Sequence, residues 1–116
     1  MTQDIHYRWP AEWETQAATW LSWPHNLDTW PGRSDPIPDV YVPWIEQLTK
    51  IQHVHLIAGP EAAQPTAIRL LAEVENLTIH RWPTNDVWIR DYGPTFVKRI
   101  SDGQLVGVDW HYNAWG

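Results

Sequence analysis

Short apolar runs recur along the chain and predict three β-strands. Residues 17–23, 51–58 and 77–82 form these runs, and a proline or a Gly-Pro pair closes each of them. Apolar runs of this length, bounded by glycine and proline, are typical of buried strands rather than helices. The stretch 7–16 is polar and Trp-bearing and is assigned no element, and residues 25–35 are predicted to form a loop.

Between the predicted strands, the apolar spacing changes to that of an amphipathic helix. A first helix is predicted to begin near Pro38, and a second helix follows with Pro65 in its first turn, where proline lacks an N–H that would be unpaired anyway. Apolar residues at i, i+3, i+4 and i+7 form one stripe on each helix. These residues are Tyr41, Trp44, Ile45 and Leu48 on the first helix, and Ala67, Leu70, Leu71 and Val74 on the second.

The last third of the chain predicts a β-hairpin. Residues 95–100 and 104–112 have strand character, and Ser101-Asp102-Gly103 is a hairpin turn between them. The full order is therefore β-α-β-α-β followed by a hairpin, which indicates an α/β fold with helices packed on a mixed sheet. At 116 residues, the chain is long enough for one domain with a modest core.

Composition excludes several functional classes. The net charge of −6 argues against binding to nucleic-acid phosphates, and the chain contains no cysteine for a disulfide or a thiolate metal site. Neither a secretory leader nor an apolar run of membrane-spanning length is found, so the cytoplasm is expected. Ten tryptophans are unusual in a chain of this size, and they indicate either core packing or a stacking site.

The most informative segment is 84–94, which reads Thr-Asn-Asp-Val-Trp-Ile-Arg-Asp-Tyr-Gly-Pro. It places Trp88 three residues before Asp91. An aromatic face and a carboxylate together suit a planar guanidinium cation, because the ring stacks on the plane and the carboxylate accepts two parallel N–H bonds. On a straight strand, the two side chains would point to opposite faces, so convergence requires a turn. The alternative is a buried Trp88 with Asp91 paired to Arg90.

Other candidate residues carry competing interpretations. Asp86 is either a second carboxylate of the site or a turn residue that accepts backbone N–H bonds. His53 and His55 share one strand face, but zinc requires three or four ligands, so half-exposed structural histidines are favoured over a metal site. The aromatic strand end formed by Trp110, Tyr112 and Trp115 is either a pocket wall or packing. Exposed N-terminal tryptophans would instead suit a carbohydrate-binding module.

Three blocks of the sequence resemble the N-terminal part of the agmatine deiminases, a bacterial peptidylarginine-deiminase-like branch of the guanidine-modifying superfamily. The blocks are residues 10–24, 84–94 and 109–116. The resemblance implies a five-bladed α/β propeller, the pentein fold, of which residues 1–116 would form the first blade and the start of the second. It also implies hydrolysis of agmatine to N-carbamoylputrescine and ammonia, in putrescine synthesis, without metal or cofactor.

The mechanism that the resemblance implies is covalent. A cysteine thiolate attacks the guanidinium carbon, a histidine shuttles protons, ammonia leaves, and water releases the product. In the family, the cysteine and the histidine lie later in the chain, so the 116 residues alone are expected to be inactive. The resemblance assigns guanidinium binding to Asp91, the aromatic wall to Trp88, a channel-lining position to Trp115, and support of the loop to Asp86 and Arg90.

The substrate choice rests on the end of the third block. Members acting on peptidyl C-terminal arginine are expected to carry arginines after Tyr-Asn, where this chain has Ala114, Trp115 and Gly116. Agmatine, which has no carboxylate, is therefore favoured over peptidylarginine. A non-catalytic guanidine- or polyamine-binding module, self-associating through an uncovered strand edge, is the alternative from another functional class.

Overall fold

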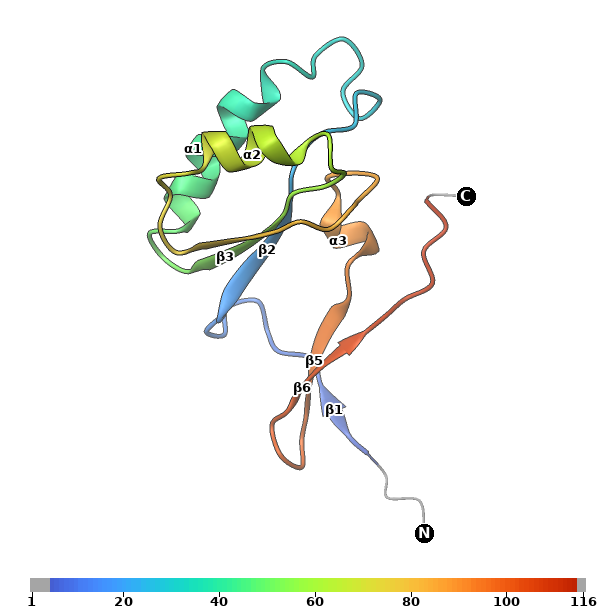
Figure 1. Cartoon of the computed structure of the whole chain (residues 1–116). Helices are drawn as coiled ribbons and strands as arrows, with labels where there is room; N and C mark the ends of the chain where they lie inside the picture. Colours follow the sequence, from blue (N-terminus) through green and yellow to red (C-terminus); the bar gives the residue numbers. More distant parts are fainter. Residues whose placement is uncertain (1–4, 115–116) are drawn as a thin grey trace. The chain divides into compact units, whose positions relative to one another are not determined.

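The computed structural model describes residues 5–114 (Figure 1). The chain divides into two compact units, which are described separately. The sheet unit comprises residues 16–89, and the hairpin unit comprises residues 1–15 together with 90–116. Among the described residues, no helix has the length and apolar character needed to cross a membrane.

The sheet unit contains a three-stranded parallel sheet in the order β2-β3-β4. Helices α1 and α2 connect consecutive strands, and because parallel crossovers are right-handed, both helices lie on the same face of the sheet (Figure 1). The elements are β2 (Ala18–Ser22), α1 (Ile37–Leu48), β3 (His53–Ile57), α2 (Gln64–Leu70) and β4 (Leu77–His80).

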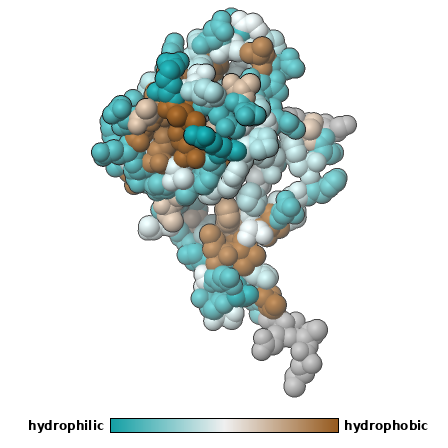
Figure 2. Space-filling view, viewed as in Figure 1, coloured by the Kyte–Doolittle hydropathy of each residue, from teal (hydrophilic) through white to brown (hydrophobic). Residues whose placement is uncertain are grey.

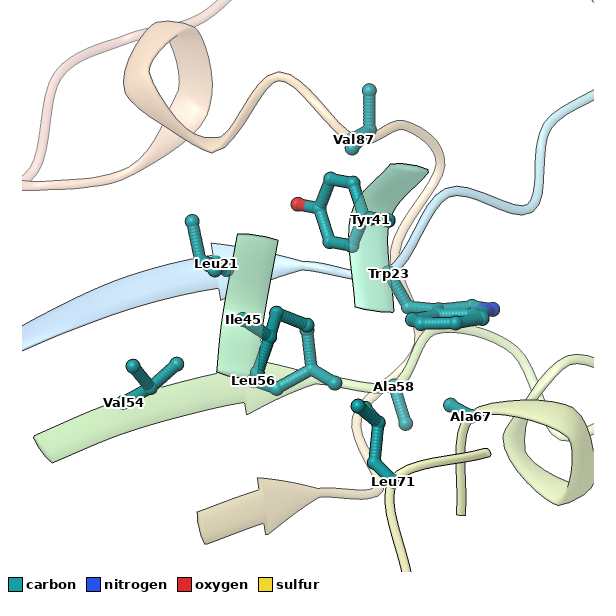
Figure 3. Close-up of a cluster of buried hydrophobic side chains, with 10 residues drawn as sticks. All are labelled: Leu21, Trp23, Tyr41, Ile45, Val54, Leu56, Ala58, Ala67, Leu71 and Val87. Carbon is teal, nitrogen blue, oxygen red and sulfur yellow. The ribbon is translucent and has the colours of Figure 1, made fainter. Parts of the chain in front are cut away.

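The core of the sheet unit lies between the sheet and the two helices (Figure 3). Val54 and Leu56 of β3 alternate with half-buried residues and are fully buried, as expected for a strand with one face on a helix layer. Ile45 of the predicted α1 stripe is also fully buried, whereas Trp44 is 47% exposed. Trp23 and Tyr41 meet edge to face, with ring centroids 5.8 Å apart.

The hairpin unit contains an antiparallel sheet in the order β1-β5-β6. Its strands are β1 (Tyr7–Arg8), β5 (Thr95–Arg99) and β6 (Leu105–Val108), and the four-residue helix α3 (Ile89–Tyr92) begins at the boundary with the sheet unit. The predicted turn is confirmed: Gly103 has φ +72°, its N–H donates to the Arg99 carbonyl, and Arg99 pairs with Asp102. Arg8 and Glu14 form a second ion pair at 2.7 Å.

One fold prediction requires correction. The prediction of a mixed sheet is wrong, because the parallel strands and the antiparallel hairpin form separate sheets. Residues 7–16, to which the sequence assigns no element, contain β1, which pairs with β5 through backbone groups that its polar side chains do not reveal. On the viewed side of the molecule, apolar side chains gather mainly over the helices and the hairpin (Figure 2).

Candidate functional site

The segment 84–88 lies at the carboxyl end of strand β2. Ser22, the last residue of that strand, is fully buried and donates its hydroxyl hydrogen to the Asp86 carbonyl at 3.1 Å. Its Oγ also lies 3.4 Å from the Thr84 hydroxyl. The carboxyl ends of parallel strands are where open α/β sheets commonly place ligands, so the segment occupies a suitable position for a site.

The loop that follows β2 holds the same segment from the other side. Asn26 donates from its side-chain amide to the Asn85 carbonyl at 3.0 Å, and Thr29 donates its hydroxyl to Asp86 Oδ1 at 2.7 Å. Asp86 Oδ1 also accepts from the Val87 N–H at 2.7 Å. The bonds from Asn26 and Thr29 join segments nearly sixty residues apart, and no spacing in the sequence predicts Ser22, Asn26 or Thr29 as partners of the segment.

The hydrogen bonds of Asp86 match the turn-residue interpretation of this carboxylate. Its Oδ1 atom serves a backbone N–H and a neighbouring hydroxyl, and the side chain is half-buried. A carboxylate engaged in this way fixes the local backbone, since charged acceptors make the stronger hydrogen bonds. A support role for Asp86 beneath a substrate site remains a prediction.

Val87 and Trp88 point to different environments. Val87 is 8% exposed and belongs to the core cluster, where it lies beside Tyr41 (Figure 3). Trp88 is 45% exposed, and its ring centroid lies 5.7 Å from that of Trp30, with the planes tilted by 52°. Trp88 is therefore not the buried tryptophan of the alternative interpretation. Stacking on a ligand requires an indole that is held in place and accessible to solvent, and Trp88 meets both conditions.

Arg90 and Asp91 are both exposed residues of helix α3. Among the described residues, no ion pair joins them and no hydrogen bond engages the Asp91 carboxylate, so the predicted alternative of local pairing is not found. The backbone turns helically from Ile89 instead of continuing as a strand. Trp115 lies outside the described residues. Trp110 lies beyond the end of β6, which is shorter than the predicted strand 104–112; it is exposed and donates its ring N–H to the Thr95 hydroxyl at 2.9 Å.

The histidines of β3 belong to a ring cluster on the sheet face opposite the helices. His55 and His80 share a hydrogen bond between ring nitrogens 3.0 Å apart, and Trp20 stacks on both rings at 4.4 and 5.0 Å. Burial lowers the pKa of His55, and the neighbouring His53 and His80 lower it further.

His80 is the third imidazole that the sequence spacing did not reveal. Both ring nitrogens of His53 already have partners, since they lie 3.0 Å from Asn76 Oδ1 and 2.8 Å from Thr78 Oγ1. Within residues 5–114, no group of three or more histidine, aspartate or glutamate side chains is arranged to hold a metal ion. We therefore interpret the ring cluster as side-chain packing on this face of the sheet.

Comparison with known proteins identifies relatives of this chain. The chain is 35% identical to agmatine deiminase of Pseudomonas syringae pv. tomato and 36% identical to that of Stutzerimonas stutzeri, with 95% and 98% of the chain covered. It spans only 29% and 30% of those two proteins. The sequence match therefore concerns less than a third of each relative.

Solved structures give the same result. C. jejuni agmatine deiminase superposes with a TM-score of 0.81 at 25% identity, covering 98% of this chain and 34% of that one. A cysteine-to-serine variant of that enzyme with substrate bound superposes with the same TM-score at 27% identity, covering 99% and 33%. The model of the Porphyromonas-type peptidyl-arginine deiminase family matches residues 8–116. The chain therefore belongs to the Porphyromonas-type peptidyl-arginine deiminase family.

Proposed function

We propose that this chain is the N-terminal part of an agmatine deiminase and contributes half of its substrate site. The observation that carries the proposal is the segment 84–94, where a 45% exposed Trp88 in contact with Trp30 precedes the exposed carboxylate of Asp91, which pairs with none of the described residues. Relatives that match nearly the whole chain are agmatine deiminases, and one of the similar structures contains bound substrate. Together, these findings favour a guanidinium ligand.

The chemistry of the ligand explains why both residues are needed. A guanidinium stays protonated at neutral pH and presents N–H donors in one plane. Asp91 accepts two parallel N–H bonds from one edge of this plane, and the indole of Trp88 stacks on its face. The backbone turns helically from Ile89, after Trp88, and so does not continue as a strand, on which residues three positions apart would point to opposite faces.

The proposed reaction needs groups that this chain does not contain. A cysteine thiolate elsewhere in the protein adds to the guanidinium carbon, the C–N bond to one terminal nitrogen breaks, and that nitrogen leaves as ammonia after gaining a proton. Water then adds to the thiouronium carbon, and breaking of the C–S bond releases N-carbamoylputrescine. Asp91 holds the positive charge in place throughout both steps, and Trp88 excludes water from one face.

We also propose that the two sheets belong to an α/β propeller of five blades. The parallel βαβαβ part and the following hairpin then form the first blade and the beginning of the second. The outer strands of both sheets support this assignment, since among the described residues they pair with no further strand and free edges are normally covered by further structure.

The direct test compares substrates in the full-length protein. We expect release of ammonia and N-carbamoylputrescine from agmatine, detected by mass spectrometry, and much slower release of ammonia from peptides with C-terminal arginine. Faster turnover of the peptides would replace agmatine with peptidylarginine as the substrate. The isolated 116 residues are expected to be inactive because they contain no cysteine. Hydrolysis of agmatine by the isolated chain would refute the covalent mechanism.

A further inference from the structure

The imidazole of His25 is held between the segment 84–88 and the turn after strand β3. His25 lies three residues beyond the end of β2, and its ring packs directly on the backbone of Gly59. A Cβ at Gly59 would lie 2.7 Å from His25 Cδ2, which is closer than such contacts occur. The ring therefore occupies the space that a Cβ at position 59 would need.

The Nε2 nitrogen of the same ring contacts the segment that carries Trp88. His25 Nε2 lies 3.1 Å from the Thr84 hydroxyl, within hydrogen-bonding distance. The buried Ser22 hydroxyl lies on the other side of Thr84 and directs its hydrogen to the Asp86 carbonyl, which can only accept. Thr84 is thus able to donate to His25, and the two residues form the end of a continuous hydrogen-bonded chain.

The segment is consequently fixed at each residue before Trp88. Thr84 is held by His25, Asn85 by Asn26, and Asp86 by Ser22 and Thr29, while Val87 is buried. His25 is the contact at the entrance of the segment, four residues before the indole. A small rotation of the backbone at Thr84 changes the path of the residues that follow and shifts the Trp88 ring. A displacement of about 1 Å of a substrate-contacting side chain is enough to weaken binding and catalysis.

We propose that His25 is a positioning residue that sets the orientation of the Trp88 wall through its hydrogen bond to Thr84. The inference rests on the proposed function, because it assigns His25 an effect on guanidinium binding. The contact with Gly59 holds the ring, and the contact with Thr84 transmits its position. Replacement of the ring nitrogen should therefore affect substrate binding more than folding.

The test uses variants of the full-length enzyme. His25→Phe keeps a planar ring against Gly59 but removes the nitrogen. His25→Gln keeps an amide oxygen that can accept from Thr84 near the place of Nε2, and Thr84→Val removes the hydroxyl at nearly constant volume. We expect the KM for agmatine to rise about threefold to tenfold in His25→Phe and in Thr84→Val, as loss of one hydrogen bond predicts. The double variant should be no worse than either single variant, and His25→Gln should restore most of the binding.

Melting temperatures and a matched control separate positioning from folding. The exposed His6, changed to Phe, should leave KM unchanged. A lower melting temperature in His25→Phe with an unchanged KM, or additive effects of the two substitutions on KM, would overturn the positioning role while leaving the proposed function intact. Absence of agmatine hydrolysis by the unaltered enzyme would overturn the proposed function and the role of His25 with it.

Discussion

The bond between Thr29 and Asp86 gives a quantitative test of how the segment 84–88 is held. Thr29→Val removes the hydroxyl that donates to Asp86 Oδ1 at 2.7 Å and keeps the branched shape of the side chain. Asp86→Ala removes that acceptor and also the one that serves the Val87 N–H, which belongs to a buried residue. Thr29→Val therefore removes one charge-assisted hydrogen bond, and Asp86→Ala removes that bond together with the one from the Val87 N–H.

The expected magnitudes follow from the burial of the carboxylate. Hydrogen bonds to charged groups contribute about 1.5–3 kcal/mol, and the low end applies because Asp86 is only half-buried. Thr29→Val should lower the free energy of unfolding by about 1.5 kcal/mol, and Asp86→Ala by about 3 kcal/mol. Because the bond from Thr29 is already absent in Asp86→Ala, the double variant should lose no more than Asp86→Ala alone, a coupling of about 1.5 kcal/mol.

The assay is equilibrium unfolding in urea, followed by tryptophan fluorescence. The control is Thr66→Val, since Thr66 is exposed on α2 and its replacement should change stability by less than about 0.5 kcal/mol. If the losses in the double variant simply add, or if Thr29→Val behaves like the control, the hydrogen bond does not hold the segment. The argument that the loop after β2 fixes the position of Trp88 would then fail.

Three further predictions concern the site and the sheet. Asp91→Asn in the full-length enzyme should lower kcat/KM for agmatine at least about a hundredfold in an ammonia-release assay, whereas Glu61→Gln, at an exposed position, should not. Gly59→Ala should lower the free energy of unfolding in urea by about 1–3 kcal/mol, because φ is +83° and the added Cβ strikes the His25 ring. Because the pKa of His55 is lowered in the folded protein, the unfolded chain binds a proton at this residue more tightly. The free energy of unfolding should therefore fall as pH drops below 6.5, as measured by thermal unfolding from pH 8 to pH 5. The fall should be less steep in the His55→Gln variant.

Local patterns were sufficient to predict most elements. The stripe of α1 predicts burial of Tyr41 and Ile45, and both are buried, because helix period and core contact express the same geometry. The turn at Ser101-Asp102-Gly103 predicts the hairpin, because its conformation is determined by these residues themselves. The two-residue strand β1 has no such signal, since its pairing depends on the backbone of β5.

The contacts that hold the segment 84–88 could not be predicted from sequence. Thr29 and Asp86 are 57 residues apart, and His25 and Thr84 are 59 apart, so their meeting depends on the β2-β3-β4 order of the sheet. His80 joins His55 for the same reason, across neighbouring strands. The segment itself could be identified from sequence because an aromatic ring at Trp88 and a carboxylate at Asp91 suit a guanidinium whatever their surroundings are.

The packing of His25 on Gly59 has an evolutionary consequence. Because a Cβ at position 59 and a ring at position 25 would compete for one volume, mutations at the two positions cannot be accepted independently. Among homologous chains, we expect glycine at position 59 wherever position 25 carries an aromatic or imidazole ring. Loss of the ring would remove the steric conflict but not the strain of a φ of +83°, so glycine is expected to persist at position 59 longer than the ring at position 25.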